Sequence, residues 1–311
     1  MTATPLHVGT FTKSLLIDLA RSTGKFEAAG LEVQETSVVS SPAQFRSLAE
    51  GEYDLVLTSP DNVIAYRYLS ANPLGTTLPV QILAGIDRGV GLSLCVAPMV
   101  DDMDDVRGQT VGVDVPQSGF AFVALALLAR AGLEPGDYSL ESLGSTPRRA
   151  EALAASECLA TVLNAGNELR ARGQGCHIIR PVTELGPYLG TVIARMEQPD
   201  PDLTAGHLRF VDVMLTMSRE ILDGQWEDEV IESAIRLLGL TDQEARAHRD
   251  CLLDPLTGLI PDGVVDGASV RTLIDLRRAY RPSDELDRVA EQWPAMLAEQ
   301  AQENMTDTRH A

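Results

Sequence analysis

The stretch Tyr53-Asp54-Leu55-Val56-Leu57-Thr58-Ser59-Pro60-Asp61 indicates how the chain folds. Residues 53–57 form a short, largely apolar run of the length of a buried strand. Ser59 can cap the free amides of a helix, and the fixed φ of Pro60 suits a first helical residue. A helical pattern follows over residues 61–71. We therefore expect a strand that ends in small hydroxyl residues at the N-terminus of a helix.

Such a junction offers free N–H groups and a partial positive charge to a small polar ligand. In open α/β sheets, ligands bind at the carboxyl ends of the strands. The same residues also fit an ordinary β-to-α turn with a serine cap. The arrangement recurs along the chain, because Ser40-Ser41-Pro42 and Gly144-Ser145-Thr146-Pro147 each precede a helical pattern.

Composition narrows the class of protein. The chain has 311 residues, which is enough for two domains. Its 44% hydrophobic and 23% charged residues are typical of a soluble globular protein. The net charge of −20 argues against binding to nucleic acid or to an anionic membrane surface. We find no run of 18 apolar residues, so we expect no membrane insertion.

The first residues bear on localisation. Residues 1–5 lead directly into the first expected strand, without the basic and apolar regions of a secretory signal. As the sequence stands, we expect a cytoplasmic protein; if a leader has been removed, we expect an extracytoplasmic one.

Motifs for metals and cofactors are absent from the sequence. The cysteines Cys95, Cys158, Cys176 and Cys251 lie far apart, and His177 and His207 show no HxxxH or HExxH spacing. We find no GxSxG, Walker or GxGxxG motif either. We therefore expect neither a bound metal nor a cofactor.

Strands and helices alternate along the first two thirds of the chain. Strands are expected over residues 6–10, 32–39, 53–57, 79–84 and 91–97, with helices over 14–29, 43–50 and 61–71 between them. After the acidic turn 101–105, strands are expected over 110–113, 138–143, 158–163 and 176–182. This alternation is typical of parallel sheets. From residue 201 onward the pattern is helical.

We therefore expect an α/β protein of two Rossmann-like lobes joined by a hinge, with a helical C-terminal extension. Residues 1–98 form the first part of lobe 1, residues 99–185 form lobe 2, and residues 186–225 return to lobe 1. Residues 226–311 form a helical segment packed on lobe 1. Two crossings make a hinge, and the cleft between the lobes is the natural pocket.

Three segments carry a resemblance to a known family. They are Phe26-Glu27-Ala28-Ala29-Gly30-Leu31-Glu32-Val33, Gly51-Glu52-Tyr53-Asp54-Leu55-Val56-Leu57-Thr58-Ser59 and Asp105-Val106-Arg107-Gly108-Gln109-Thr110-Val111-Gly112-Val113. In order and spacing they resemble the type II periplasmic-binding-protein fold. More narrowly, they resemble the solute-binding proteins of ABC transporters for nitrate, sulfonate, taurine and thiamine-pyrimidine precursors. The resemblance covers residues 6 to about 222.

The resemblance implies a pocket built from loops at strand ends and helix N-termini. Matched position by position, the ligand-binding residues it implies are Thr10, Phe11, Ser40, Ser41, Thr58, Ser59, Gln117, Ser118, Gly119 and Asn164. The family also includes a thiamine pyrimidine synthase that depends on a cysteine-rich motif. That motif is missing here, so we do not expect that activity.

Three further residues are candidates from their own chemistry. Arg88, in the turn after a strand, suits a bidentate contact to an anionic ligand, and it equally fits a surface turn. His7 could act as a catalytic base, or it could be a structural histidine within its strand. Asp61 could be catalytic, or it could interact with the dipole of its own helix.

The sequence leaves two functions open. In the first, the chain binds a small polar or anionic organic molecule without chemistry, with an ABC permease as a candidate partner. In the second, it is a cytoplasmic, cofactor-independent lyase, decarboxylase or hydrolase in the same cleft, since this fold also hosts cytoplasmic enzymes such as chorismate dehydratase. The missing leader favours the enzyme, and the lack of acid, base or nucleophile motifs favours the binding protein. We favour binding.

Overall fold

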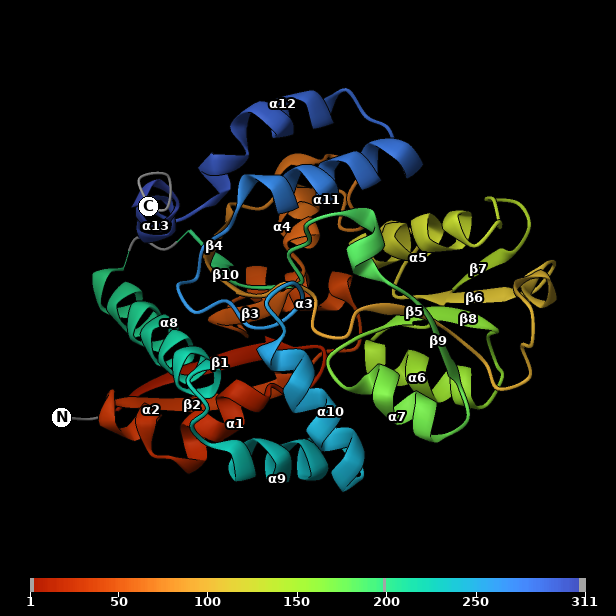
Figure 1. Cartoon of the computed structure of the whole chain (residues 1–311). Helices are drawn as coiled ribbons and strands as arrows, with labels where there is room; N and C mark the ends of the chain where they lie inside the picture. Colours follow the sequence, from red (N-terminus) through yellow and green to blue (C-terminus); the bar gives the residue numbers. More distant parts are fainter. Residues whose placement is uncertain (1–2, 198–199, 308–311) are drawn as a thin grey trace.

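Strand β3 (Leu55–Thr58) lies in the middle of the first of two five-stranded sheets in the computed structural model, which describes residues 3–197 and 200–307 (Figure 1). Ser59 accepts a hydrogen bond from the Asp61 N–H and caps helix α4 (Pro60–Tyr68). The structure therefore confirms the predicted strand, serine cap and helix start.

The first sheet has the strand order β2-β1-β3-β10-β4. Its other strands are β1 (Thr4–Thr10), β2 (Leu31–Ser37), β4 (Val80–Asp87) and β10 (Thr191–Met196). Strand β1 is parallel to β2 and β3, whereas β10 is antiparallel to β3 and β4. The helices of this part are α1 (Leu15–Ser22), α2 (Lys25–Ala28), α3 (Ser41–Ala49), α4 and α8 (Pro201–Leu222).

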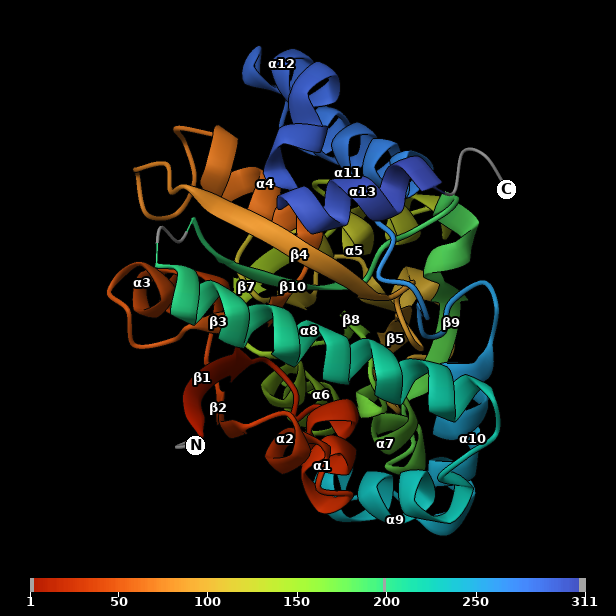
Figure 2. The ribbon, with the colours of Figure 1, turned by 90° about the vertical axis from the view of Figure 1, so that its left-hand side faces the viewer.

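Both faces of this sheet are buried. Alternate residues of β10 belong to different hydrophobic clusters: Val192 packs with the cluster around α4, and Ile193 packs with the cluster that includes Phe210 of α8. Helix α8 crosses the sheet on that second face (Figure 2). Burial on both faces explains why β3 and β4 are largely apolar along their length, whereas β2 at the edge of the sheet is mostly polar.

The second sheet has the order β7-β6-β8-β5-β9. Its strands are β5 (Ser93–Val96), β6 (Thr110–Val113), β7 (Ser139–Ser142), β8 (Ala160–Leu163) and β9 (His177–Pro181). Strand β6 is parallel to β7 and β8, and β5 is antiparallel to β8 and β9. Helices α5 (Gly119–Arg130), α6 (Thr146–Ala154) and α7 (Asn167–Gly173) belong to this part, with short 3-10 turns at Met103–Val106 and Val182–Leu185.

Two strands change the expected path of the chain. Strand β5 pairs in the second sheet, so the first crossing lies before it, at residues 88–92, and not near residue 98. Residues 191–196, within the segment expected to return to lobe 1, form strand β10 of the first sheet. Each lobe thus receives one antiparallel strand beside a crossing, and local patterns did not reveal these long-range partners.

The expected helix over residues 14–29 is divided into α1 and α2. Gly24 separates them with a left-handed backbone, at a φ of 72°. Glycine adopts this conformation without the steric cost that other residues meet.

The C-terminal helices bridge both lobes. They are α9 (Glu227–Leu238), α10 (Asp242–Leu253), α11 (Gly267–Tyr280), α12 (Glu285–Gln292) and α13 (Glu299–Asp307), with a 3-10 turn at Trp293–Met296. Helix α9 packs on α1, whereas α10 also reaches α7, and α11 lies between α4 and α5 (Figure 1). The expectation that this segment packs on lobe 1 alone therefore describes only part of its contacts.

The two crossings lie against each other. The Gly190 N–H donates to the Asp87 carbonyl at 2.9 Å, and a Cβ on Gly190 would lie 2.5 Å from the Gly89 Cα. Only glycine fits at Gly190, because real Cβ atoms do not approach so closely. The Asp87 carboxylate accepts the Gly89 N–H at 2.7 Å and fixes the turn at the start of the first crossing.

A buried ion pair joins α4, α5 and α11. Arg277 contacts Asp61 through two hydrogen bonds of 2.6 and 2.7 Å, and the two side chains are 3% and 1% exposed. Arg277 also donates to the Gln117 carbonyl at 3.2 Å and lies 5.0 Å from the Phe122 ring centre. A Cβ on Gly119 would lie 2.6 Å from the Asp61 Cβ, so glycine is required there.

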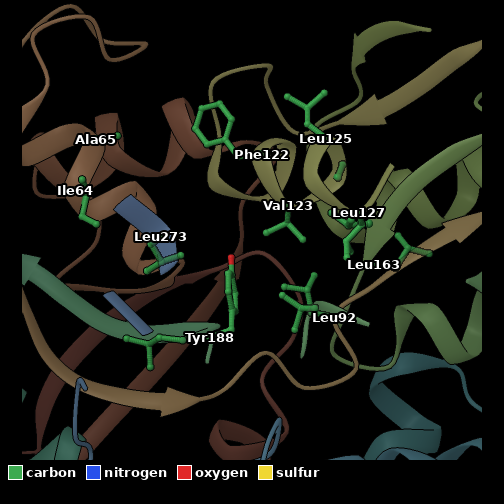
Figure 3. Packing of buried hydrophobic residues seen from close by; sticks show 14 of the residues in the cluster. Ile64, Ala65, Leu92, Phe122, Val123, Leu125, Leu127, Leu163, Tyr188 and Leu273 are labelled. Atoms are coloured by element: carbon green, nitrogen blue, oxygen red, sulfur yellow. The ribbon is translucent and has the colours of Figure 1, made fainter. Parts of the chain in front are cut away.

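The hydrophobic cluster beside this ion pair spans both lobes. Ile64 of α4, Phe122 and Val123 of α5, Leu273 of α11 and Tyr188 converge in one cluster (Figure 3). The ion pair and this cluster together hold the two lobes against each other on one side.

A second buried carboxyl lies beside the first crossing. Glu168 of α7 is 2% exposed, and a Cβ on Gly91 would lie 2.2 Å from its Oε1 atom. Within the described residues no side chain hydrogen-bonds to either carboxyl oxygen, and the nearby backbone N–H groups of Gly166 and Glu168 oppose only part of the cost of burial. Burial raises the pKa of Glu168 to about 8.

We expect loss of one partner of the Asp61–Arg277 pair to destabilise the fold strongly. Asp61→Asn and Arg277→Met should each lower the free energy of unfolding by about 3–5 kcal/mol, because each leaves an uncompensated buried group. The double variant should lose less than the sum of the two single losses. Urea unfolding measures this, with the exposed neighbour variant Arg278→Met as a near-neutral control. If the double variant lost the full sum of the two single losses, Asp61 and Arg277 would not stabilise the fold as a coupled pair.

We expect Glu168→Gln to stabilise the fold more as the pH rises. Between pH 4.5 and about pH 8 the folded chain holds a proton on Glu168 that the unfolded chain releases. The free energy of unfolding of the wild type should therefore decrease as the pH rises through this window. Glu168→Gln should not show this decrease. The gain at pH 7 should be about 3 kcal/mol and should be absent below about pH 4.5. Urea unfolding at pH 5 to 8 measures this, with Glu151→Gln at an exposed site as the control that should follow the wild type. Parallel pH curves for wild type and Glu168→Gln would refute it.

Candidate ligand-binding site

A cavity of about 150 Å³ lies between the two sheets. Thr10 and Thr58, the last residues of β1 and β3, line it from the first lobe. Asp114 and Asn164, which directly follow β6 and β8, line it from the second lobe. The cavity thus lies at the carboxyl ends of the parallel strands of both sheets, where ligands bind in open α/β folds.

One part of the cavity wall is apolar and continues into a hydrophobic cluster. Leucine, isoleucine and valine side chains of the first lobe and the C-terminal segment form it: Leu15, Leu16, Leu57, Ile86, Val90, Leu238, Leu252 and Leu259. This wall favours a ligand with an apolar portion.

Small hydroxyl groups of the cavity are held by hydrogen bonds. Thr10 donates to the Glu35 carboxylate at 2.8 Å, and the Ser14 N–H donates to the same oxygen at 2.7 Å. Asn62 donates to the Thr58 hydroxyl at 3.1 Å. These contacts orient the loop after β1 and the end of β3, so the hydroxyl groups have fixed positions in the cavity wall.

Four helices begin at the cavity. Ser14, Ser59 and Ser118 cap α1, α4 and α5, and Thr146 is the first residue of α6. All of them line the cavity. The partial positive charges of the helix N-termini therefore favour negative charge in this space.

Arg149 of α6 is the buried cation of the cavity wall. Its side chain is 2% exposed and donates to neutral oxygens: the Gly144 carbonyl at 2.6 Å, the Thr146 and Thr161 hydroxyls at 3.1 and 3.2 Å, and the Val162 carbonyl at 3.2 Å. Within the described residues no carboxylate lies within 4.0 Å of it. Burial lowers the pKa of Arg149 to about 10, and the charge of Asp114 opposes this shift.

Asp114 places a carboxylate in the same wall and also joins the lobes. It accepts the Ser41 N–H of α3 at 3.2 and 3.4 Å. Two other hydrogen bonds cross between the lobes, from Asn167 to the Thr12 hydroxyl at 3.2 Å and from the Ser145 N–H to the Val39 carbonyl at 2.9 Å. The cavity therefore lies between lobes that contact each other around it.

The structure brings seven of the eleven predicted ligand-binding residues to the cavity. They are Thr10, Phe11, Thr58, Ser59, Ser118, Gly119 and Asn164. They come from strand ends and helix starts of both lobes, and their roles in ligand binding stay predictions.

The other four lie outside the cavity wall, each for a visible reason. Ser40 caps α3 through the Ala43 N–H, and Ser41 is turned to Asp114. Arg88 donates to the Leu259 carbonyl at 3.2 Å, so it anchors the C-terminal segment to the first crossing. The Gln117 carbonyl accepts from Arg277. Asp87, which precedes Arg88 in the chain, does line the cavity.

The two catalytic candidates do not line the cavity. His7 is exposed on β1 and hydrogen-bonds to Gln34 on the neighbouring strand. The Asp61 carboxylate is fully engaged by Arg277. Burial raises the pKa of Asp61, and the charge of Arg277 opposes that shift. The contact of His7 with Gln34 fits the structural role that the sequence left open for this histidine, whereas the ion pair of Asp61 with Arg277 is a role that the sequence did not indicate.

Several cavity residues were missed by the sequence analysis. The sequence could have indicated Arg149, because a cation near the N-terminus of a helix is unfavourable with the helix dipole and therefore calls for an explanation. It could also have indicated Asp114, as a carboxylate directly after a buried strand. It could not have indicated His248, Leu252 and Leu259, because nothing local indicates that the C-terminal segment reaches the cleft.

Within 3–197 and 200–307, no group of three or more histidine, cysteine, aspartate or glutamate side chains is arranged to hold a metal ion. Among the helices described, none combines the length and the apolar character needed to cross a bilayer.

Comparison by sequence finds neither a matching protein-family model nor a matching curated protein. Comparison by structure matches almost the whole chain. The periplasmic nitrate-binding protein NrtA of Synechocystis PCC 6803 has a TM-score of 0.73 at 12% identity, covering 99% of this chain and 89% of that one. The alkanesulfonate-binding protein SsuA of Xanthomonas axonopodis pv. citri, bound to MOPS, has a TM-score of 0.69 at 14% identity, covering 91% and 95%.

A third structure, the zinc-bound ligand-binding component of an ABC-type import system from Staphylococcus aureus, has a TM-score of 0.71 at 9% identity, covering 90% of this chain and 93% of that one. At sequence identities this low, structural similarity shows the fold alone. The chain therefore has the two-lobed fold of the periplasmic binding proteins, which is the fold that the sequence resemblance implied.

Proposed function

We propose that the chain is a solute-binding protein that holds a small polar or anionic organic molecule in the cavity and releases it unchanged. The observation that carries the proposal is Arg149, a guanidinium buried in the cavity wall without a carboxylate at contact distance among the described residues.

The physical argument concerns the cost of a buried charge. A buried cation is favourable only when polar groups or an opposite charge compensate for its lost hydration. Carbonyl and hydroxyl oxygens solvate Arg149, but they do not neutralise it. An anionic group of a ligand would supply the missing charge, and the helix N-termini at the cavity would add to the attraction.

Asp114 limits which anions fit. A ligand must keep its negative charge near Arg149 and away from the Asp114 carboxylate. A ligand that turns an N–H or O–H group toward Asp114 satisfies both residues at once. A polar organic molecule suits this wall better than a symmetric anion does.

The structural neighbours support a role in import. They are a nitrate-binding protein, an alkanesulfonate-binding protein and the ligand-binding component of an ABC-type import system. We propose by analogy that an ABC permease is the partner of this chain. On this proposal the chain acts outside the cytoplasm, which is the second of the two locations that the sequence left open.

The enzyme alternative finds less support in the geometry. Its two candidate catalytic residues, His7 and Asp61, lie outside the cavity wall, and Asp61 is engaged by Arg277. A lyase, decarboxylase or hydrolase in this cleft would need other groups for proton transfer.

We expect Arg149 to control binding. Thermal shift and titration calorimetry with nitrate, sulfate and short-chain carboxylates and sulfonates should identify anions that stabilise the wild type. Arg149→Met should weaken their binding by about a hundredfold, since a charge-assisted contact is worth on the order of 2–3 kcal/mol. Arg149→Lys should retain part of the affinity, because it keeps the charge without the planar fork.

The adjacent Arg148 gives a matched control. It lies on the same helix but is half exposed and paired with Glu157 at the surface. Arg148→Met should bind like the wild type. Equal affinities in Arg148→Met and Arg149→Met, or steady consumption of a bound compound by the wild type, would contradict the proposal.

A further inference from the structure

The C-terminal segment contributes one polar side chain to an apolar part of the wall. Four of its residues line the cavity: Leu238 at the end of α9, His248 and Leu252 of α10, and Leu259. The three leucines belong to the hydrophobic cluster on that side. An imidazole among leucines must have a hydrogen-bonding role or carry an energetic cost.

Among the described residues, no side chain or backbone group hydrogen-bonds to His248. The residue is 2% exposed, and its Nδ1 atom is buried without a partner. A Cβ on Gly166 would lie 3.5 Å from the Nδ1 atom, so this nitrogen faces the start of α7. His248 also lines the cavity, so Nε2 is the ring nitrogen that can meet a molecule there. A buried polar group without a partner costs about 1–3 kcal/mol.

The charge state of His248 sets what it can recognise. Burial lowers the pKa of His248 to about 4, so the ring is neutral near pH 7. A neutral imidazole offers one N–H donor and one nitrogen acceptor. It therefore suits a hydroxyl, an amide or a ring nitrogen, and it gives no charge to attract an anion.

The size of the cavity is the second constraint. Its volume is about 150 Å³. An apolar protein cavity of about this volume accommodates benzene, a molecule of six heavy atoms. An inorganic anion of four or five atoms held at Arg149 would leave both the apolar wall and His248 without contact.

We propose that His248 determines specificity by hydrogen bonding to an uncharged group of the ligand, which is an organic anion of about six to eight heavy atoms. Its anionic group binds at Arg149, its carbon skeleton lies on the leucine wall, and its hydroxyl, amide or ring nitrogen meets the imidazole. The inference rests on the proposed function and names the class of molecule that the site takes.

The test compares ligands that differ by a single uncharged group. The probes are butyrate, its 2-, 3- and 4-hydroxy derivatives, succinamate, propanesulfonate and 3-hydroxypropanesulfonate, with nitrate and sulfate as inorganic anions. Calorimetry gives Kd for the wild type, His248→Leu and His248→Gln. His177→Gln, at an exposed histidine of β9, is the matched control.

We expect one of the hydroxyl- or amide-bearing anions to bind the wild type at least about tenfold tighter than its unsubstituted parent. His248→Leu should remove that advantage while leaving the affinity for the parent within about twofold. His248→Gln should retain part of the advantage, and His177→Gln should retain all of it. If His248→Leu does not fold, the ligand pairs in the wild type and His248→Gln still decide the question.

Four results would overturn the inference. Nitrate or sulfate could bind as tightly as the best organic anion, the hydroxyl or amide advantage could persist in His248→Leu, or no probe could bind the wild type at about 10 mM. In the first two cases binding still depends on Arg149, so the proposed function stands while the role of His248 falls. A loss of all anion binding in His248→Leu, equal for parent and derivative, would also count against a specific contact.

Discussion

The buried contact between Asp61 and Arg277 is the interaction on which the arrangement of the lobes depends. It ties α4 of the first lobe to α11 of the C-terminal segment, and the same guanidinium reaches the Gln117 carbonyl and the Phe122 ring of the second lobe. Separating Asp61 from Arg277 would leave an uncompensated buried charge, so the pair holds α4 and α11 together. An opening of the cleft about the two crossings would have to separate Arg277 from one of these partners.

The cavity follows from this closure. With the lobes in contact, strand ends of both sheets and the starts of four helices surround one space of about 150 Å³. Polar groups gather on the side of Arg149 and Asp114, and leucines from the C-terminal helices form the other side. A molecule that fits both sides has a charged end and an apolar body, and it adds contacts between lobes that already touch.

Local patterns predicted most elements but not all of their partners. The junction at Ser59 and Pro60 was predicted correctly, because capping and φ preference are properties of adjacent residues. The sheet that β5 joins and the existence of β10 depend on strands far away in the sequence, so periodicity could not reveal them. The resemblance placed Thr58 and Ser118 at the cavity, but it ended near residue 222 and so could not indicate His248.

The most direct measurement is mass spectrometry of a metabolite extract before and after incubation with the purified protein, including the fraction that stays bound to it. The account predicts one retained species, an organic anion with an uncharged polar group, that is released with its mass unchanged. Retention should disappear with Arg149→Met and persist with Arg148→Met. A species that disappears while a new mass grows with time would show chemistry in the cleft and would contradict the account.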